Sequence, residues 1–135
     1  MKKKDSGQIG DYIILGIGIL LFTLLIVVFF TNAETVQKKI DINQLSRQYI
    51  LRMETVGYLT VDDRAELTTK LNDIGVTEVS FSGTTLSQVG YGNDIVLEFT
   101  GDLHYREITV SSLFSPQASD GVISVHEKRF STAKN

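Results

Sequence analysis

The stretch of residues 12–56 reads YIILGIGILLFTLLIVVFFTNAETVQKKIDINQLSRQYILRMETV, an apolar run followed by an amphipathic one. Its first 20 residues, 12–31, carry no charge and include fifteen Leu, Ile, Val or Phe side chains. At about 1.5 Å per helical residue they would span roughly 30 Å, the thickness of a bilayer core. Each of these side chains favours insertion by about 0.3–0.6 kcal/mol, so their sum is several kcal/mol. We therefore predict a transmembrane helix over residues 12–31.

A cleaved signal peptide is the main alternative for this apolar run. Residues 31–33, Thr-Asn-Ala, precede Glu34 and resemble a cleavage site with small side chains. The apolar region of a signal peptide usually has about 7–15 residues, and this run is longer. The sequence therefore favours an anchor that is not cleaved at this point.

The second half of the stretch has an amphipathic helical pattern. Its apolar residues recur every three or four positions, which places them on one stripe of a helix. No glycine or proline interrupts the chain between Gly18 and Gly57. We predict one continuous helix from about Tyr12 to Val56, roughly 67 Å long at 1.5 Å per residue. The predicted stripe is Ile42, Leu45, Tyr49, Met53 and Val56.

A second, shorter helix is predicted after Gly57, which can adopt the left-handed conformation that ends the first one. Thr60 can cap its N-terminus and Gly75 ends it. Asp62, Asp63 and Glu66 could suggest a metal or catalytic cluster, but acids are also favoured in the first turns by the helix dipole. The predicted buried side of this helix is Val61, Leu67, Leu71 and Ile74.

From Val76 onward the apolar residues alternate with polar ones, which is typical of half-buried strands. Val79 and Phe81 share one face of a first strand, and the glycine-rich residues 90–94 form the turn before a long second strand. Gly101 suggests a bulge or bend within that strand. The predicted inward residues of the long strand are Ile95, Leu97, Phe99, Leu103 and Tyr105.

A last strand is predicted over residues 121–130, after a polar loop that contains Pro116, with Ile123 and Val125 as inward candidates. The fold class is therefore α+β, with three or four antiparallel strands. The apolar face of this sheet is expected to pack on the exposed half of the long helix, assisted by the short one. Residues 32–135 would form this single domain.

Charge and motifs exclude several classes of function. Residues 32–135 contain ten basic and fourteen acidic residues, interspersed, so the sequence predicts no nucleic-acid partner. There is no cysteine, zinc-binding motif, nucleophile elbow or phosphate-binding loop. His104 and His126 fall on the polar faces of predicted strands. We predict no enzymatic activity, no metal and no cofactor.

Residues 1–11 form a short basic leader with three lysines before the apolar run. Basic residues near a span favour the cytoplasmic side, but Lys38, Lys39 and Arg47 follow the span in equal number. The shortness and charge density of the leader favour a cytoplasmic N-terminus. The expected localisation is thus a single-pass membrane protein with residues 32–135 outside the cytoplasm.

This order of features resembles that of type IV pilin-like proteins, and most closely the TadE-like minor pseudopilins of tight-adherence pili. The resemblance covers the whole chain in architecture, is specific at the N-terminus, and is looser over residues 57–99. In that family a prepilin peptidase cuts after a glycine that ends the basic leader, and an acid followed by an aromatic residue lies a few residues further on. Here Gly7 resembles the glycine, Asp11 the acid and Tyr12 the aromatic residue.

The resemblance implies cleavage between Gly7 and Gln8 by a prepilin peptidase. Asp11 could then pair with the new amine of a neighbouring subunit as N-terminal helices bundle. It also implies a non-catalytic subunit that joins or primes a surface filament or secretion pseudopilus and contacts other pilin-like subunits through that helix. Asp11 replaces the usual glutamate and is the fourth residue after the junction instead of the fifth. A cut after Ser6 would restore the spacing.

The residues leave a second interpretation open. Asp11 can cap the transmembrane helix in the headgroup region, with Tyr12 as an interfacial aromatic residue. Ser6, Gly7 and Gly10 would then belong to a flexible tail. The protein would be a membrane-anchored extracellular binding module that does not enter a filament.

Overall fold

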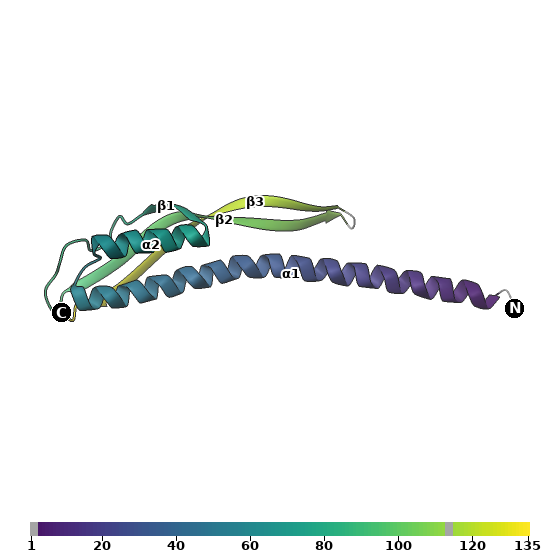
Figure 1. Cartoon of the computed structure of the whole chain (residues 1–135), viewed down its shortest axis with the longest axis horizontal. Helices are drawn as coiled ribbons and strands as arrows, with labels where there is room; N and C mark the ends of the chain where they lie inside the picture. Colours follow the sequence, from purple (N-terminus) through teal and green to yellow (C-terminus); the bar gives the residue numbers. More distant parts are fainter. Residues whose placement is uncertain (1–2, 113–114) are drawn as a thin grey trace.

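The fold is α+β, and a long N-terminal helix runs through most of the length of the molecule (Figure 1). A computed structural model describes residues 3–112 and 115–135. These described residues form three antiparallel strands in the order β1-β2-β3, and both helices contact this sheet. The elements are α1 (Lys3–Val56), α2 (Val61–Ile74), β1 (Val76–Ser80), β2 (Asp94–Ser112) and β3 (Ser115–Thr132).

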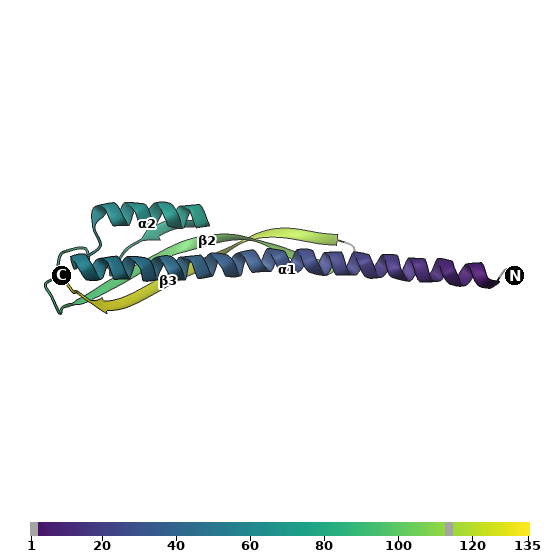
Figure 2. The same cartoon turned by 60° about the horizontal axis from the view of Figure 1, so that its bottom comes forward.

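Helix α1 is continuous, as predicted, but it begins at Lys3 and not at Tyr12 (Figure 2). The helix therefore includes Gly7, Gly10 and Asp11. Asp11 lies more than two turns inside α1, so the interpretation of Asp11 as an N-cap is wrong. The interpretation of Gly7 and Gly10 as a flexible tail is wrong for the same reason.

The hydrophobic core lies where the C-terminal half of α1 packs against the sheet and α2. The predicted stripe on α1 is confirmed for four of its five residues, because Ile42, Tyr49 and Met53 are buried and Leu45 packs against the core, whereas Val56 at the end of the helix is only half-buried. Burial of this stripe stabilises the domain and holds α1 on β2 and β3. The other buried apolar residues are Ile50, Leu59, Leu67, Leu71, Val76, Ile95, Leu97, Phe99, Leu103 and Ala133.

Helix α2 has the predicted ends but a narrower buried side. The Thr60 hydroxyl accepts the backbone N–H of Asp63 at 3.1 Å, and Gly75 closes the helix in the left-handed conformation. Leu67 and Leu71 are buried as predicted. Val61 is 71% exposed, because at about 100° per residue it lies roughly 120° around the helix from Leu67.

The β2–β3 hairpin is much longer than predicted. β2 continues to Ser112 and β3 starts at Ser115, so the predicted polar loop around Pro116 is part of a strand. Pro116 pairs with Val110 in this ladder. Proline has no backbone N–H to donate. β3 is an edge strand, so proline fits at a position whose N–H would face away from β2.

Gly101 does not form the predicted bulge, because it pairs with Val125 in an unbroken part of the β2–β3 ladder. The irregularity lies opposite, in β1, where the register shifts between Thr77 and Ser80. Glu78 has a positive φ of 54° at that shift. A Cβ atom at Gly101 would lie 2.5 Å from a methyl carbon of Val76, so glycine here permits close strand contact.

Polar contacts fix the hairpin and the C-terminal segment to α1. The Arg129 guanidinium donates to the Ser46 hydroxyl at 3.0 Å and to the Asn43 side-chain oxygen at 2.8 Å. The Lys134 ammonium lies 2.6 Å from a Glu54 carboxylate oxygen, and the Ser131 hydroxyl donates to the same carboxylate. These contacts extend the attachment of the sheet beyond the apolar core.

Two of the three acids at the start of α2, Asp63 and Glu66, pair with Arg52 of α1. The Arg52 guanidinium lies 3.1 Å from the Asp63 carboxylate and 3.1 Å from the Glu66 carboxylate. Lys70 also contacts Glu66 at 2.7 Å. The hydrogen bonds from Lys70 and Arg52 lower the pKa of Glu66 from 4.5 to about 2.

These contacts predict that acid loosens the packing of α2 on α1. Unfolded Glu66 would bind a proton near its ordinary pKa of 4.5, and folded Glu66 only near 2. The ion pairs therefore stabilise the fold above pH 4.5, and this contribution is lost as the pH falls through about 2. Thermal unfolding of the full chain between pH 6 and pH 2 should show a falling midpoint.

The Glu66→Gln variant is the control for this prediction, because it removes the titrating group and keeps the side-chain size. Its midpoint should depend less steeply on pH over the same range. An identical pH dependence in both proteins would contradict the assignment to Glu66.

Candidate functional site

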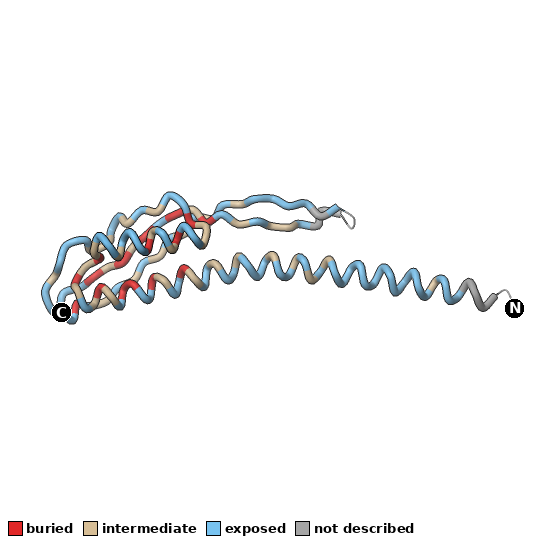
Figure 3. Tube along the Cα trace, in the orientation of Figure 1, coloured by how far each residue is buried: buried red, intermediate tan, exposed pale blue. Residues whose placement is uncertain are grey.

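The apolar half of α1 is the most unusual surface of this protein. Figure 3 shows that the buried residues among those described lie in the other half of α1, in the sheet and α2, and in the segments that adjoin them. One window of 18 residues in α1 is apolar enough to cross a membrane, and none of it is buried inside the protein. We call residues 12–31 the apolar segment. Its exposure distinguishes it from the core helix of a soluble domain.

The two threonine hydroxyls of the apolar segment have partners inside the helix. Thr23 donates to the carbonyl of Ile19 at 2.8 Å, and Thr31 donates to that of Val27 at 2.9 Å. Such bonds to the preceding turn satisfy a hydroxyl without water. The segment is therefore compatible with a hydrocarbon environment along its length.

The four residues implied by the pilin resemblance lie together at the N-terminal edge of the apolar segment. Gly7 and Asp11 are four residues apart in α1, and so are Gln8 and Tyr12, which places each pair on one helix face. All four residues are exposed, and the Tyr12 side chain is 72% exposed. A free amine at Gln8 would put Asp11 in the first turn of the shortened helix, next to its positive end.

The two histidines lie on the exposed side of the sheet and make separate contacts. His104 Nε2 is 2.9 Å from the Thr77 hydroxyl, and His126 Nε2 is 2.7 Å from a Glu98 carboxylate oxygen. Lys128 also contacts Glu98, at 3.1 Å. His126 and Lys128 lower the pKa of Glu98 from its ordinary value of 4.5. Within residues 3–112 and 115–135, no group of three or more His, Asp or Glu could hold a metal ion.

The outer part of the hairpin forms a feature that the sequence did not reveal. We call residues 106–112 and 115–120 the distal hairpin. It extends past the core and lies beside the apolar segment of α1 (Figures 1 and 2). The periodicity of apolar residues predicts each helix and strand separately. It does not show that the distal hairpin lies beside the apolar segment of α1.

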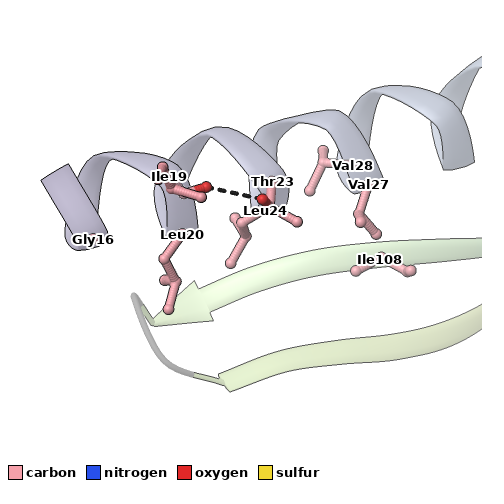
Figure 4. Close-up of a pocket in the computed structure, with 8 residues that line it drawn as sticks. All are labelled: Gly16, Ile19, Leu20, Thr23, Leu24, Val27, Val28 and Ile108. Atoms are coloured by element: carbon pink, nitrogen blue, oxygen red, sulfur yellow. Dashed lines mark hydrogen bonds between the residues drawn. The ribbon is translucent and has the colours of Figure 1, made fainter.

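A groove of about 520 Å³ lies between α1 and the distal hairpin. In Figure 4, Leu20, Leu24 and Val27 point from the helix toward β2, and Ile108 lies on the strand side. The walls are almost entirely aliphatic, and the hydroxyl of Thr23 is bonded to Ile19. The other lining residues are Gly16, Ile19 and Val28.

The helix places the four residues implied by the pilin resemblance and the apolar segment in one continuous element, and the hairpin adds an apolar groove beside the segment. Together they form a surface suited to association, in lipid or with other helices. Comparison with protein-family models, with curated proteins and with solved structures finds no match for this chain.

Proposed function

We propose that this protein is a non-catalytic, pilin-like subunit that is anchored in a membrane and joins or primes a type IV or Tad-type filament or pseudopilus. The observation that carries the proposal is the continuity of α1. One helix of 54 residues connects the basic leader, the apolar segment and the core of the domain. Such a helix can be held in a membrane by one half and present a folded domain with the other.

The position of Asp11 supports the same proposal. A charged side chain at the edge of an apolar helix is unfavourable unless it reaches water or a partner of opposite charge. Removal of residues 1–7 would create an amine at Gln8, and an amine on a neighbouring subunit could pair with Asp11. In this proposal the cytoplasm holds the leader, and the α+β domain lies on the other side of the membrane.

The proposed cleavage requires the helix to open at the junction. Gly7 and Gly10 each disfavour helix by about 1 kcal/mol relative to alanine and lie within the first eight residues of α1, so this end of the helix opens at a lower free-energy cost than one with alanine at both positions. Apart from the neighbouring residues and the backbone of the helix itself, nothing described in the structure lies within 4 Å of a Cβ atom added at either glycine. A peptidase that binds an extended chain could therefore reach the bond between Gly7 and Gln8.

Mass spectrometry of the mature N-terminus tests the proposal. In cells with an active prepilin peptidase we expect a chain that starts at Gln8. A start at Gly7 would move the junction to Ser6, and an intact leader in those cells would contradict processing. The Gly7→Ala variant should keep the leader, because alanine stabilises the helix across the junction and replaces the residue before the cut.

The Gly18→Ala variant is a matched control, since Gly18 is also a helical glycine with open space around it. It should be processed like the unchanged chain. Equal loss of processing in both variants would show that helix stability anywhere in α1, and not the junction itself, controls cleavage.

A membrane-anchored binding module outside any filament is the second candidate function, since the exposed surface of the sheet and α2 could bind a partner. Crosslinking from position 11 separates the two. Adducts with pilin-like subunits support the filament subunit, and a chain that crosslinks to no such subunit would instead support the binding module.

A further inference from the structure

The groove between α1 and the distal hairpin continues the interface that forms the core. Going toward the N-terminus, the stripe on α1 runs from buried Ile42 through partly exposed Lys38, Thr31, Val28 and Leu24. These positions are three, four or seven residues apart and share one helix face. The hairpin therefore follows the same face of α1 beyond the core, but it covers this face only in part.

The walls of the groove are unsuited to water. Ile19 and Leu20, which line it, remain 59% and 52% exposed in the isolated chain. Apolar surface is unfavourable in water, so a groove of this composition favours an apolar occupant. The remaining question is which occupant the surroundings allow.

Lipid is a poor occupant when the hairpin lies along the helix. Arg106 and Asp120 form an exposed ion pair across the distal hairpin at 3.5 Å. β3 is also an edge strand, with one row of backbone groups unpaired by the sheet. Charges and open strand edges are excluded from hydrocarbon. This arrangement therefore belongs to a state in which the hairpin side of the apolar segment lies outside the bilayer core.

We infer that the apolar segment of a second copy of this chain occupies the groove. That segment is apolar and mostly exposed, with partly covered positions such as Leu24 and Val28, and it matches the groove in chemistry. In the assembled state α1 and the distal hairpin would hold a neighbouring helix between them. The inference rests on the filament subunit proposed above and specifies how two copies contact each other.

Photocrosslinking from Ile108 tests the inference in the full-length chain. A photoreactive amino acid replaces Ile108, and cells or filaments that contain the protein are irradiated. We expect an adduct of about twice the 15.0 kDa of one chain, with the attachment mapped by mass spectrometry to residues 12–31 of the second copy. Mixing isotope-labelled and unlabelled chains distinguishes adducts between chains from those within one chain.

Two further probe positions separate failure of this inference from failure of the proposed function. Leu25 is 62% exposed on the apolar segment and does not line the groove, so a probe there reports any contact between helices of two copies. Phe130 is 69% exposed on β3 and should give no adduct with residues 12–31. Adducts between copies from Leu25 but not Ile108 would overturn the groove and leave the filament subunit intact. Adducts from neither probe with this chain or with any other pilin-like subunit would overturn both.

Filling the groove supplies a second measurement. Gly16 lines the groove and Gly18 does not, although each has open space around it. Gly16→Leu should lower the yield of the Ile108 adduct by about tenfold by overfilling the contact, and Gly18→Leu should leave the yield nearly unchanged. Equal yields in both variants, or adducts of Ile108 with lipid alone, would overturn the inference.

Discussion

Replacing Phe99 by alanine is expected to cost about 3–5 kcal/mol of folding free energy, the range measured for large aromatic residues in well-packed cores. Phe99 is fully buried on β2, and its ring centroid lies 6.2 Å from that of Phe81. Small domains have only about 5–15 kcal/mol of stability, so the variant should lose much of its folded population. Denaturant unfolding of the full chain in detergent micelles, followed by near-ultraviolet circular dichroism, measures the change.

Phe130→Ala is the matched control, because Phe130 lies on the neighbouring strand and is 69% exposed. An exposed substitution of this kind usually changes stability by no more than about 0.5 kcal/mol. Equal losses in the two variants would show that the sheet face assigned to the core is incorrect.

Two arginines in the apolar segment, in the double variant Phe22→Arg and Leu25→Arg, are expected to prevent stable insertion. Each arginine costs about 2.5–3.5 kcal/mol near the centre of a span and also removes a favourable apolar side chain. The pair therefore offsets most of the several kcal/mol by which residues 12–31 favour the bilayer. Both side chains are exposed and neither lines the groove, so the change acts on contact with lipid.

Alkaline extraction of membranes checks this prediction, since it releases proteins that do not span the bilayer. The double variant should appear in the soluble fraction and the unchanged chain in the membrane pellet. Ile40→Arg with Leu51→Arg supplies the control, because both residues are exposed on α1 outside the apolar segment. Retention of the Phe22 and Leu25 variant in the pellet would contradict a span at residues 12–31.

The parts of the fold that depend on neighbours in sequence could be predicted. Helix α1 continues to Val56 because no glycine or proline interrupts it after Gly18, and its core stripe follows from helical spacing. Gly57 and Gly75 end the two helices because each adopts a positive φ. These features are properties of local chain geometry, and a single sequence contains them.

The parts that depend on distant partners could not be predicted. Arg52 contacts Asp63 and Glu66, but a charged residue gives no sign in sequence of which opposite charge it will meet. The distal hairpin was hidden for a different reason. Core residues of β2, such as Phe99, have odd numbers, whereas the groove residue Ile108 has an even number. Strand twist turns the other side of the hairpin toward α1, and alternation alone does not reveal it.

The candidate site also has one part that local sequence predicts and one part that depends on distant residues. The positions of Gly7, Gln8, Asp11 and Tyr12 on adjacent faces of one helix follow from their spacing. The groove does not, because it arises between residues of α1 and β2 that are far apart in sequence. Whether the leader is cut and whether a second copy fills the groove stay predictions for the experiments above.

Because α1 is unbroken, a change in the tilt of its membrane segment also moves its far end. If residues 12–31 lie in the bilayer, residues 32–56 extend the same rigid axis by about 38 Å. A tilt of about 20°, common for membrane helices, would then displace the far end sideways by roughly 13 Å. The domain is packed on that far end, so it must follow. The angle of the anchor in the membrane would set the direction in which the domain faces, without any hinge between them.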